Sequence, residues 1–241
     1  MDIKDLEKEI SQLKITKPKH RGEDVENRSL PFMLSTFREL IQNEIPPTQD
    51  KFLHTFKAKY PDLKMRGITS RLKRAYLSYV REYHLGYVLK KHFRKVIYDE
   101  KIDIAGVDYV IYYRGRKFNI HAFVNTENGK YWREIKNGRH KFRGEHLDLP
   151  MDLDRGKKCG KLILYTDDQV LNLKKEMDKI IKARRRSDIK RQNSDIQPQN
   201  SKISDIILEI MACDILMDKL ASVVTFENVA RKTVLNKVLI Y

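Results

Sequence analysis

The sequence predicts an α/β protein with a mixed central β-sheet of about five strands flanked by helices. An N-terminal helical region and a C-terminal helical tail are expected on either side of this core. Residues 31–93 repeat apolar side chains at helical spacing. After Phe93 the chain changes to runs rich in β-branched and aromatic residues, which favour strands. A near-continuous apolar run at residues 160–166 indicates a strand covered on both faces.

Helices account for the first part of the chain. Apolar residues recur at spacings of three and four near the start, which predicts a short amphipathic helix: Ile3, Leu6, Ile10 and Leu13. We expect residues 1–30 to act as an N-terminal arm. Residues 31–93 should form a basic helical region, interrupted by Pro46–Pro47 and by Pro61. Thr48 is placed to cap the helix that follows it.

Residues 94–185 are expected to form the α/β core. The runs KVIYDE, DYVIYYRG and KFNIHAFV predict three strands, and Arg114–Gly115–Arg116 between the last two predicts a tight hairpin turn. A polar segment at residues 125–144 precedes two further strands, HLDLP and GKLILYT. A helix with Val170, Leu173 and Met177 on one side should close the core.

The end of the chain differs in composition from the core. Residues 186–201 form a polar, low-complexity stretch that we interpret as a linker. Residues 202–241 contain five basic and five acidic residues together with many Ile, Leu and Val residues. We expect a helical interaction segment here, which could join two copies of the chain as a homodimer. The alternative is a helix that covers the same core.

Net charge indicates the kind of partner. Lys and Arg number 49 against 33 Asp and Glu, a formal net charge of +16. Such a surface attracts polyanions, so nucleic acid is the expected partner, with double-stranded DNA first. An anionic membrane, or a basic surface that merely docks acidic proteins, is the alternative. No apolar run approaches the length of a transmembrane helix, the N-terminus lacks a signal pattern, and the two cysteines lie far apart, so a cytoplasmic location is expected.

Basic residues gather in two segments. Residues 64–95 hold ten basic residues and one acid, and three of them could contact phosphates: Arg71, Lys73 and Arg74. Residues 114–143 hold nine basic and two acidic residues with Tyr131 and Trp132 among them, a mixture suited to base stacking and phosphate contact. The expected contacts in this segment are Arg114, Arg116, Lys130, Trp132, Arg133, Lys136, Arg139, Lys141 and Arg143. The alternatives are a solvated helix face and a loop whose aromatic residues pack locally.

One short segment could carry chemistry. Asp103 and Asp108 bracket Gly106 at the start of a predicted strand, and His121 lies in the middle of the returning strand. Side chains alternate across a strand, so the hairpin can place Asp108 and His121 on one side of the sheet. We expect this pair to face a hollow that solvent can reach. The alternatives are turn chemistry for the two acids and a core role for the histidine.

This segment resembles the PD-(D/E)XK nuclease superfamily, and within it the TaqI-type restriction endonucleases. Asp103, Gly106, Val107 and Asp108 match the motif D-x-x-G-[IV]-D, and Gly115 matches the glycine of the hairpin turn. His121 falls on the family's Gln or Glu position. HLDLP and GKLILYT resemble the strands that follow. The resemblance covers roughly residues 68–183 and implies a restriction-endonuclease-like fold.

The resemblance also implies a DNA endonuclease that depends on Mg²⁺ or Mn²⁺. Asp108 and Asp103 would then ligate the metal, with Glu82 as a further carboxylate and His121 as a base or ligand. Such a nuclease could come from a mobile element or a phage. The sequence departs from the family at Phe123, which stands where the family has its lysine. The alternative function is therefore a nucleic-acid-binding protein that keeps the fold without catalysis.

Overall fold

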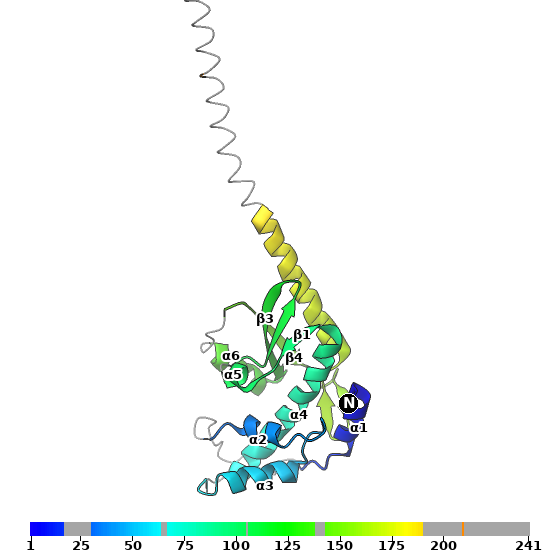
Figure 1. Cartoon of the computed structure of the whole chain (residues 1–241), viewed down its shortest axis with the longest axis vertical. Coiled ribbons are helices and arrows are strands. Elements are labelled where there is room, and N and C mark those ends of the chain that lie inside the picture. Colours follow the sequence, from blue (N-terminus) through cyan, green and yellow to red (C-terminus); the bar gives the residue numbers. More distant parts are fainter. Residues whose placement is uncertain (17–29, 64–66, 105, 138–142, 190–208, 210–241) are drawn as a thin grey trace, which may run out of the picture. The chain divides into compact units, whose positions relative to one another are not determined.

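A computed structural model gives the fold (Figure 1). It describes residues 1–16, 30–63, 67–104, 106–137, 143–189 and 209. The chain divides into two units, Met1–Lys179 and Ile180–Tyr241. The first unit holds all the named helices and strands. The expected interaction segment at residues 202–241, with its homodimer, lies outside the described residues except for Glu209.

Four helices precede the central sheet: α1 (Ile3–Gln12), α2 (Met33–Glu39), α3 (Gln49–Lys59) and α4 (Ile68–His92). The Thr48 side chain accepts a hydrogen bond from the Lys51 N–H at 3.3 Å, so the predicted cap is confirmed. Leu6 and Ile10 of α1 are buried in the same apolar cluster as residues of α2, α3 and α4. The first helix of the expected arm is therefore part of the core.

The central sheet contains β1 (Lys95–Ile97), β2 (Tyr109–Tyr113), β3 (Arg116–Val124) and β4 (Glu145–Met151) in that order. The first two pairings are antiparallel, whereas β3 and β4 run parallel. Arg114 and Gly115 connect β2 to β3 with φ angles of 48° and 76°. Positive φ at both residues is the geometry of a two-residue hairpin turn, which confirms the predicted hairpin.

The fifth predicted strand does not join this sheet. β6 (Leu162–Leu164) pairs only with β5 (Lys157–Cys159), as a separate two-stranded sheet. Leu162 and Leu164 are buried, as the apolar run predicted, but they pack into the apolar cluster of the N-terminal helices. The central sheet therefore has four strands, and the expectation of about five was wrong because burial alone does not identify a strand's neighbours.

Helices cover both faces of the central sheet (Figure 1). On one face, α5 (Glu100–Ile104) contacts β2 and α6 (Glu127–Asn137) contacts β3. On the other face, α4 contacts β1, and the Tyr109 hydroxyl donates a hydrogen bond to the Glu82 carbonyl of α4. The fold is thus mixed α/β, as predicted. None of the described helices is both long and apolar enough to cross a membrane.

Candidate functional site

Asp108 and His121 meet at the start of the β2–β3 hairpin. Tyr109 pairs with Ile120, and the Asp108 N–H also donates to the Ile120 carbonyl at 3.0 Å, so both residues lie against the position that precedes His121. The Asp108 carboxylate accepts a hydrogen bond from the Ala122 N–H at 2.6 Å, which ties it to the strand that carries His121. Asp108 is therefore joined to the strand that carries His121, and a shared chemical role for the two residues stays a prediction.

The open hollow expected at this pair is not present. Asp108 is 4% exposed and His121 is 1% exposed. Their surroundings are polar rather than purely apolar, because each side chain makes hydrogen bonds. A buried polar group that is hydrogen-bonded costs little and helps to define the packing of the sheet.

A chain of hydrogen bonds fixes the protons on His121. Asn119 donates through Nδ2 to the Arg143 carbonyl at 3.4 Å and to His146 Nε2 at 3.2 Å. His146 must then carry its proton on Nδ1, which lies 2.9 Å from His121 Nε2. His121 in turn donates through Nδ1 to the Gly106 carbonyl at 3.0 Å. Both ring nitrogens of His121 are therefore engaged in hydrogen bonds.

His146 and Asp148 are the residues of this cluster that the sequence interpretation missed. In the parallel pairing of β3 with β4, His146 lies beside Asn119 and Asp148 lies beside His121. The ring planes of His121 and His146 are nearly parallel, at 12°, with centroids 5.2 Å apart, and the rings meet edge to edge through their hydrogen bond. A local signal existed, because HLDLP places a histidine and an aspartate two residues apart and therefore on one face of a strand.

Arg133 fastens α6 to this face of the sheet. Its Nε lies 2.6 Å from an oxygen of Asp148, and its residue exposure is 8%. Arg133 was predicted to contact nucleic acid, whereas the structure uses it in a partly buried ion pair. Because Asp148 belongs to β4, the ion pair fixes the orientation of α6 against the sheet. The opposite side of α6 faces solvent.

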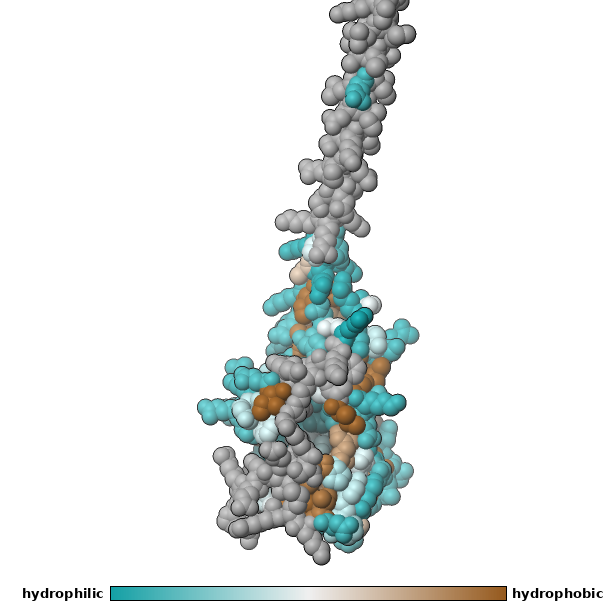
Figure 2. All heavy atoms as spheres, turned by 90° about the vertical axis from the view of Figure 1, so that its left-hand side faces the viewer, coloured by the Kyte–Doolittle hydropathy of each residue, from teal (hydrophilic) through white to brown (hydrophobic). Residues whose placement is uncertain are grey.

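The outward side of α6 carries aromatic residues. Tyr131 is 57% exposed and Trp132 is 48% exposed, and their rings meet edge to face with centroids 5.4 Å apart. Lys130 precedes them and is also exposed. We call Lys130, Tyr131 and Trp132 the α6 surface. Figure 2 views the molecule from the side of α5 and α6, where hydrophilic residues predominate and the apolar ones form small, separate patches.

Glu82 affects the pKa of both Tyr98 and Tyr109, whereas Asp103 affects that of Tyr98 and Asp108 that of Tyr109. Burial raises the pKa of Tyr98, and the Glu82 and Asp103 carboxylates raise it further. Burial also raises the pKa of Tyr109, with Glu82 and Asp108 adding to the effect. Among the residues that the structure describes, no three His, Cys, Asp or Glu side chains converge closely enough to hold a metal ion. The Mg²⁺ or Mn²⁺ site stays a prediction.

The remaining predicted contacts are spread over the surface. Arg71, Lys73 and Arg74 are half-buried in the first turns of α4. Arg114 at the hairpin turn is exposed and forms an ion pair with Asp178 at 3.1 Å, Arg116 is half-buried and Arg143 is exposed. Arg139, Lys141 and the side chain of Lys136 lie outside the described residues.

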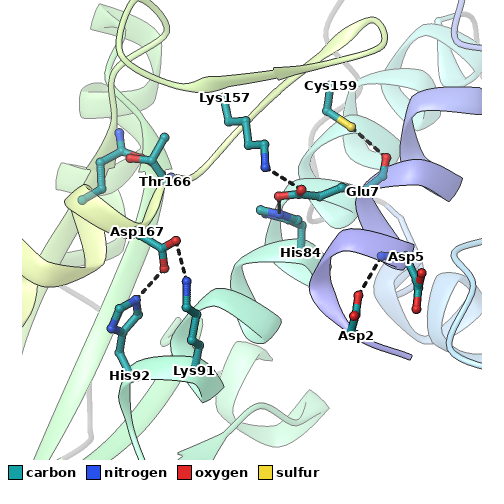
Figure 3. Close-up of polar contacts among 11 residues, drawn as sticks. Asp2, Asp5, Glu7, His84, Lys91, His92, Lys157, Cys159, Thr166 and Asp167 are labelled. Carbon is teal, nitrogen blue, oxygen red and sulfur yellow. Dashed lines mark hydrogen bonds and ion pairs between the residues drawn. The ribbon is translucent and has the colours of Figure 1, made fainter.

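A second polar cluster joins α1 to the rest of the first unit (Figure 3). Glu7 contacts His84 of α4 at 3.2 Å and Lys157 of β5. Asp167 contacts Lys91 at 2.8 Å and His92 at 2.6 Å. Burial lowers the pKa of His84, and its contact with Glu7 opposes that change. These contacts link elements that are distant in sequence, which is a structural role.

Comparison with known proteins identifies no relative. The chain matches no family model, and no curated protein or solved structure is significantly similar to it.

Proposed function

We propose that the protein binds nucleic acid through the α6 surface, with Arg143 and other basic residues of segment 114–143 contacting phosphates. The exposed Tyr131–Trp132 pair carries this proposal. Large aromatic side chains that remain exposed on a helix, in a segment with nine basic and two acidic residues, suit base stacking combined with phosphate contact. The polar cluster beneath α6 supports the proposal by holding the helix in one orientation.

Double-stranded DNA is the first partner to test, because a net charge of +16 suits the dense charge of a duplex. The aromatic pair adds a preference. Stacking on Trp132 needs the face of a base, so an unpaired base in a single strand or at a duplex defect should strengthen binding. A protein that read only charge would prefer the duplex at low salt.

The test compares affinity for labelled single-stranded and duplex oligonucleotides by fluorescence anisotropy. Loss of one stacked base typically costs about 1–3 kcal/mol, so Trp132→Ala should weaken single-strand binding by roughly 5- to 150-fold. Leu171→Ala is the matched control, since Leu171 is 38% exposed on the helical segment that follows β6. Equal affinities of the Trp132→Ala and Leu171→Ala variants would exclude the α6 surface as the binding site.

A second candidate function is metal-dependent DNA hydrolysis on a restriction-endonuclease-like fold. The hydrogen bond from the Ala122 N–H to Asp108, which joins this acid to the strand that carries His121, favours it. Two observations weigh against it: both ring nitrogens of His121 are engaged, and Phe123 replaces the family's lysine. Hydrolysis would therefore require His146 to release His121.

Plasmid cleavage separates the two functions. The protein is incubated with supercoiled plasmid and Mg²⁺ or Mn²⁺ beside Asp108→Asn, which keeps the size of the side chain and an acceptor for the Ala122 N–H. Cleavage by the native chain that is lost in the variant supports the nuclease. Binding of the plasmid without cleavage, in the presence of either metal ion, supports the binding protein.

A further inference from the structure

A small cavity lies on the face of the sheet opposite the α6 surface. Its volume is about 150 Å³, and it is lined by Tyr83, Gly86, Tyr87, Lys90, Val96, Tyr98 and Tyr109. Tyr109 and His121 project from opposite faces, because Tyr109 pairs with Ile120, the neighbour of His121 on β3. We call this space the tyrosine cavity. An apolar cavity of roughly this size can hold one benzene ring, so the cavity suits a single planar ring.

The walls of the tyrosine cavity are aromatic and held in place. The rings of Tyr98 and Tyr109 stack with centroids 4.8 Å apart at an interplanar angle of 23°. Tyr83 and Tyr87, one turn apart on α4, meet edge to face with centroids 5.5 Å apart, and their hydroxyls lie 3.3 Å from each other. Tyr83 is anchored to the Glu44 carbonyl at 3.0 Å. The walls therefore offer aromatic surface for contact with a ring, and hydroxyl oxygens that can accept hydrogen bonds.

Two cations lie against these walls. The Arg38 guanidinium carbon is 4.0 Å above the centre of the Tyr98 ring, and Lys90 Nζ is 5.7 Å from the centre of the Tyr87 ring. Within the described part of the chain, the buried Arg38 Nη2 has no hydrogen-bond partner. Glu44, an acid close to Lys90, is bonded to the amino group of Met1. Lys90 lines the cavity and gives it a donor for an anion, whereas Arg38 covers a face of Tyr98 and does not line the cavity.

Gly86 indicates that the empty volume of the tyrosine cavity has a function. Glycine is the least favourable residue in a helix interior apart from proline, and Gly86 lies deep within the 25-residue helix α4. The backbone does not require glycine there, since a Cβ would meet the Tyr109 hydroxyl at 3.5 Å, an ordinary contact. The missing side chain leaves the tyrosine cavity open.

From these observations we infer that the tyrosine cavity binds one unstacked nucleobase of a nucleotide, with a pyrimidine favoured by size and its phosphate held by Lys90. The ring packs against the aromatic walls, and Lys90 contacts the phosphate. The nucleotide is either free or an unpaired unit of a strand. This inference does not rest on the α6 surface, because the two sites occupy opposite faces of the sheet.

Calorimetric titration with thymidine monophosphate, thymidine and inorganic phosphate tests the inference. We expect saturable binding of the monophosphate, weaker binding of thymidine, and weaker binding still of phosphate alone. Gly86→Leu should reduce affinity for the monophosphate by about tenfold or more, the loss expected when a base no longer stacks. Trp132→Ala should leave it unchanged, which separates this site from the proposed α6 surface.

Lys90→Ala keeps the test decisive if Gly86→Leu does not fold. It should remove most of the difference in affinity between the monophosphate and thymidine. Absence of saturable monophosphate binding, equal binding by phosphate alone, or full affinity in folded Gly86→Leu would each overturn the inference. Displacement of the monophosphate by a thymidine oligonucleotide but not by a blunt duplex would identify an unpaired unit of a strand as the source. Failure of both to displace it would identify a free nucleotide.

Discussion

The Asp108 carboxylate holds the start of a hairpin together. Its contact with the Ala122 N–H replaces the backbone acceptor that a longer β2 would supply. An unsatisfied buried donor costs about 1–3 kcal/mol. Asp108→Ala should therefore lower the free energy of unfolding by about this amount, and Asp108→Asn by less, as measured by urea denaturation. Equal stability of native protein and Asp108→Ala would contradict this role.

This role affects how any loss of activity is interpreted. A drop in DNA cleavage or binding in Asp108→Ala could follow from weakened folding alone. Asp108→Asn changes the charge and keeps an oxygen that can accept the hydrogen bond. It is therefore the more informative substitution at this position, provided that its unfolding curve matches that of the native chain.

His84 makes stability depend on pH. Burial lowers its pKa in the folded state, and the charges nearby are Glu7, Lys157 and Asp167. The unfolded chain then binds a proton at His84 more readily than the folded chain does, so stability falls as the pH drops below about 6.5. His84→Gln should lose less stability between pH 7.5 and pH 5.5 than the native protein does, measured by urea denaturation at each pH. Parallel losses would show that other groups set the pH dependence.

At the scale of elements, α4 links the helical core to the sheet. Its one interior glycine weakens it, since glycine costs about 1 kcal/mol relative to alanine in a helix interior. Gly86→Ala should therefore raise the free energy of unfolding by about 0.5–1 kcal/mol, because the new Cβ meets only an ordinary contact. Thermal or urea denaturation measures this. A loss of stability would mean that packing against Tyr109 requires glycine, and the argument from Gly86 would fail.

The elements also show what sequence alone could predict. The β2–β3 hairpin was predictable because its apolar pattern and the Arg114–Gly115 turn are local signals. The partner of β6 was not, since its apolar run reports burial without naming the neighbouring strand. The His121–His146 contact was missed for the same reason: it depends on the parallel pairing of β3 with β4, which joins residues 25 positions apart.

At the scale of the whole molecule, the net charge of +16 predicts salt-sensitive binding. Each phosphate contact releases a bound counterion, so affinity for duplex DNA falls linearly on a log–log plot against salt. About six contacts would give a slope of about −5. Titrations at several salt concentrations measure this slope. An affinity that does not change with salt concentration would exclude nucleic acid as the partner and would indicate that the basic surface has another use.

The emission of Trp132 tests the central claim most directly. It is the only tryptophan of the chain and is 48% exposed on the α6 surface. Base stacking on this ring should quench its fluorescence saturably as a single-stranded oligonucleotide is added, with the same midpoint that anisotropy of the labelled strand reports. Binding detected by anisotropy while the emission of Trp132 stays constant would place the nucleic acid elsewhere and contradict the account.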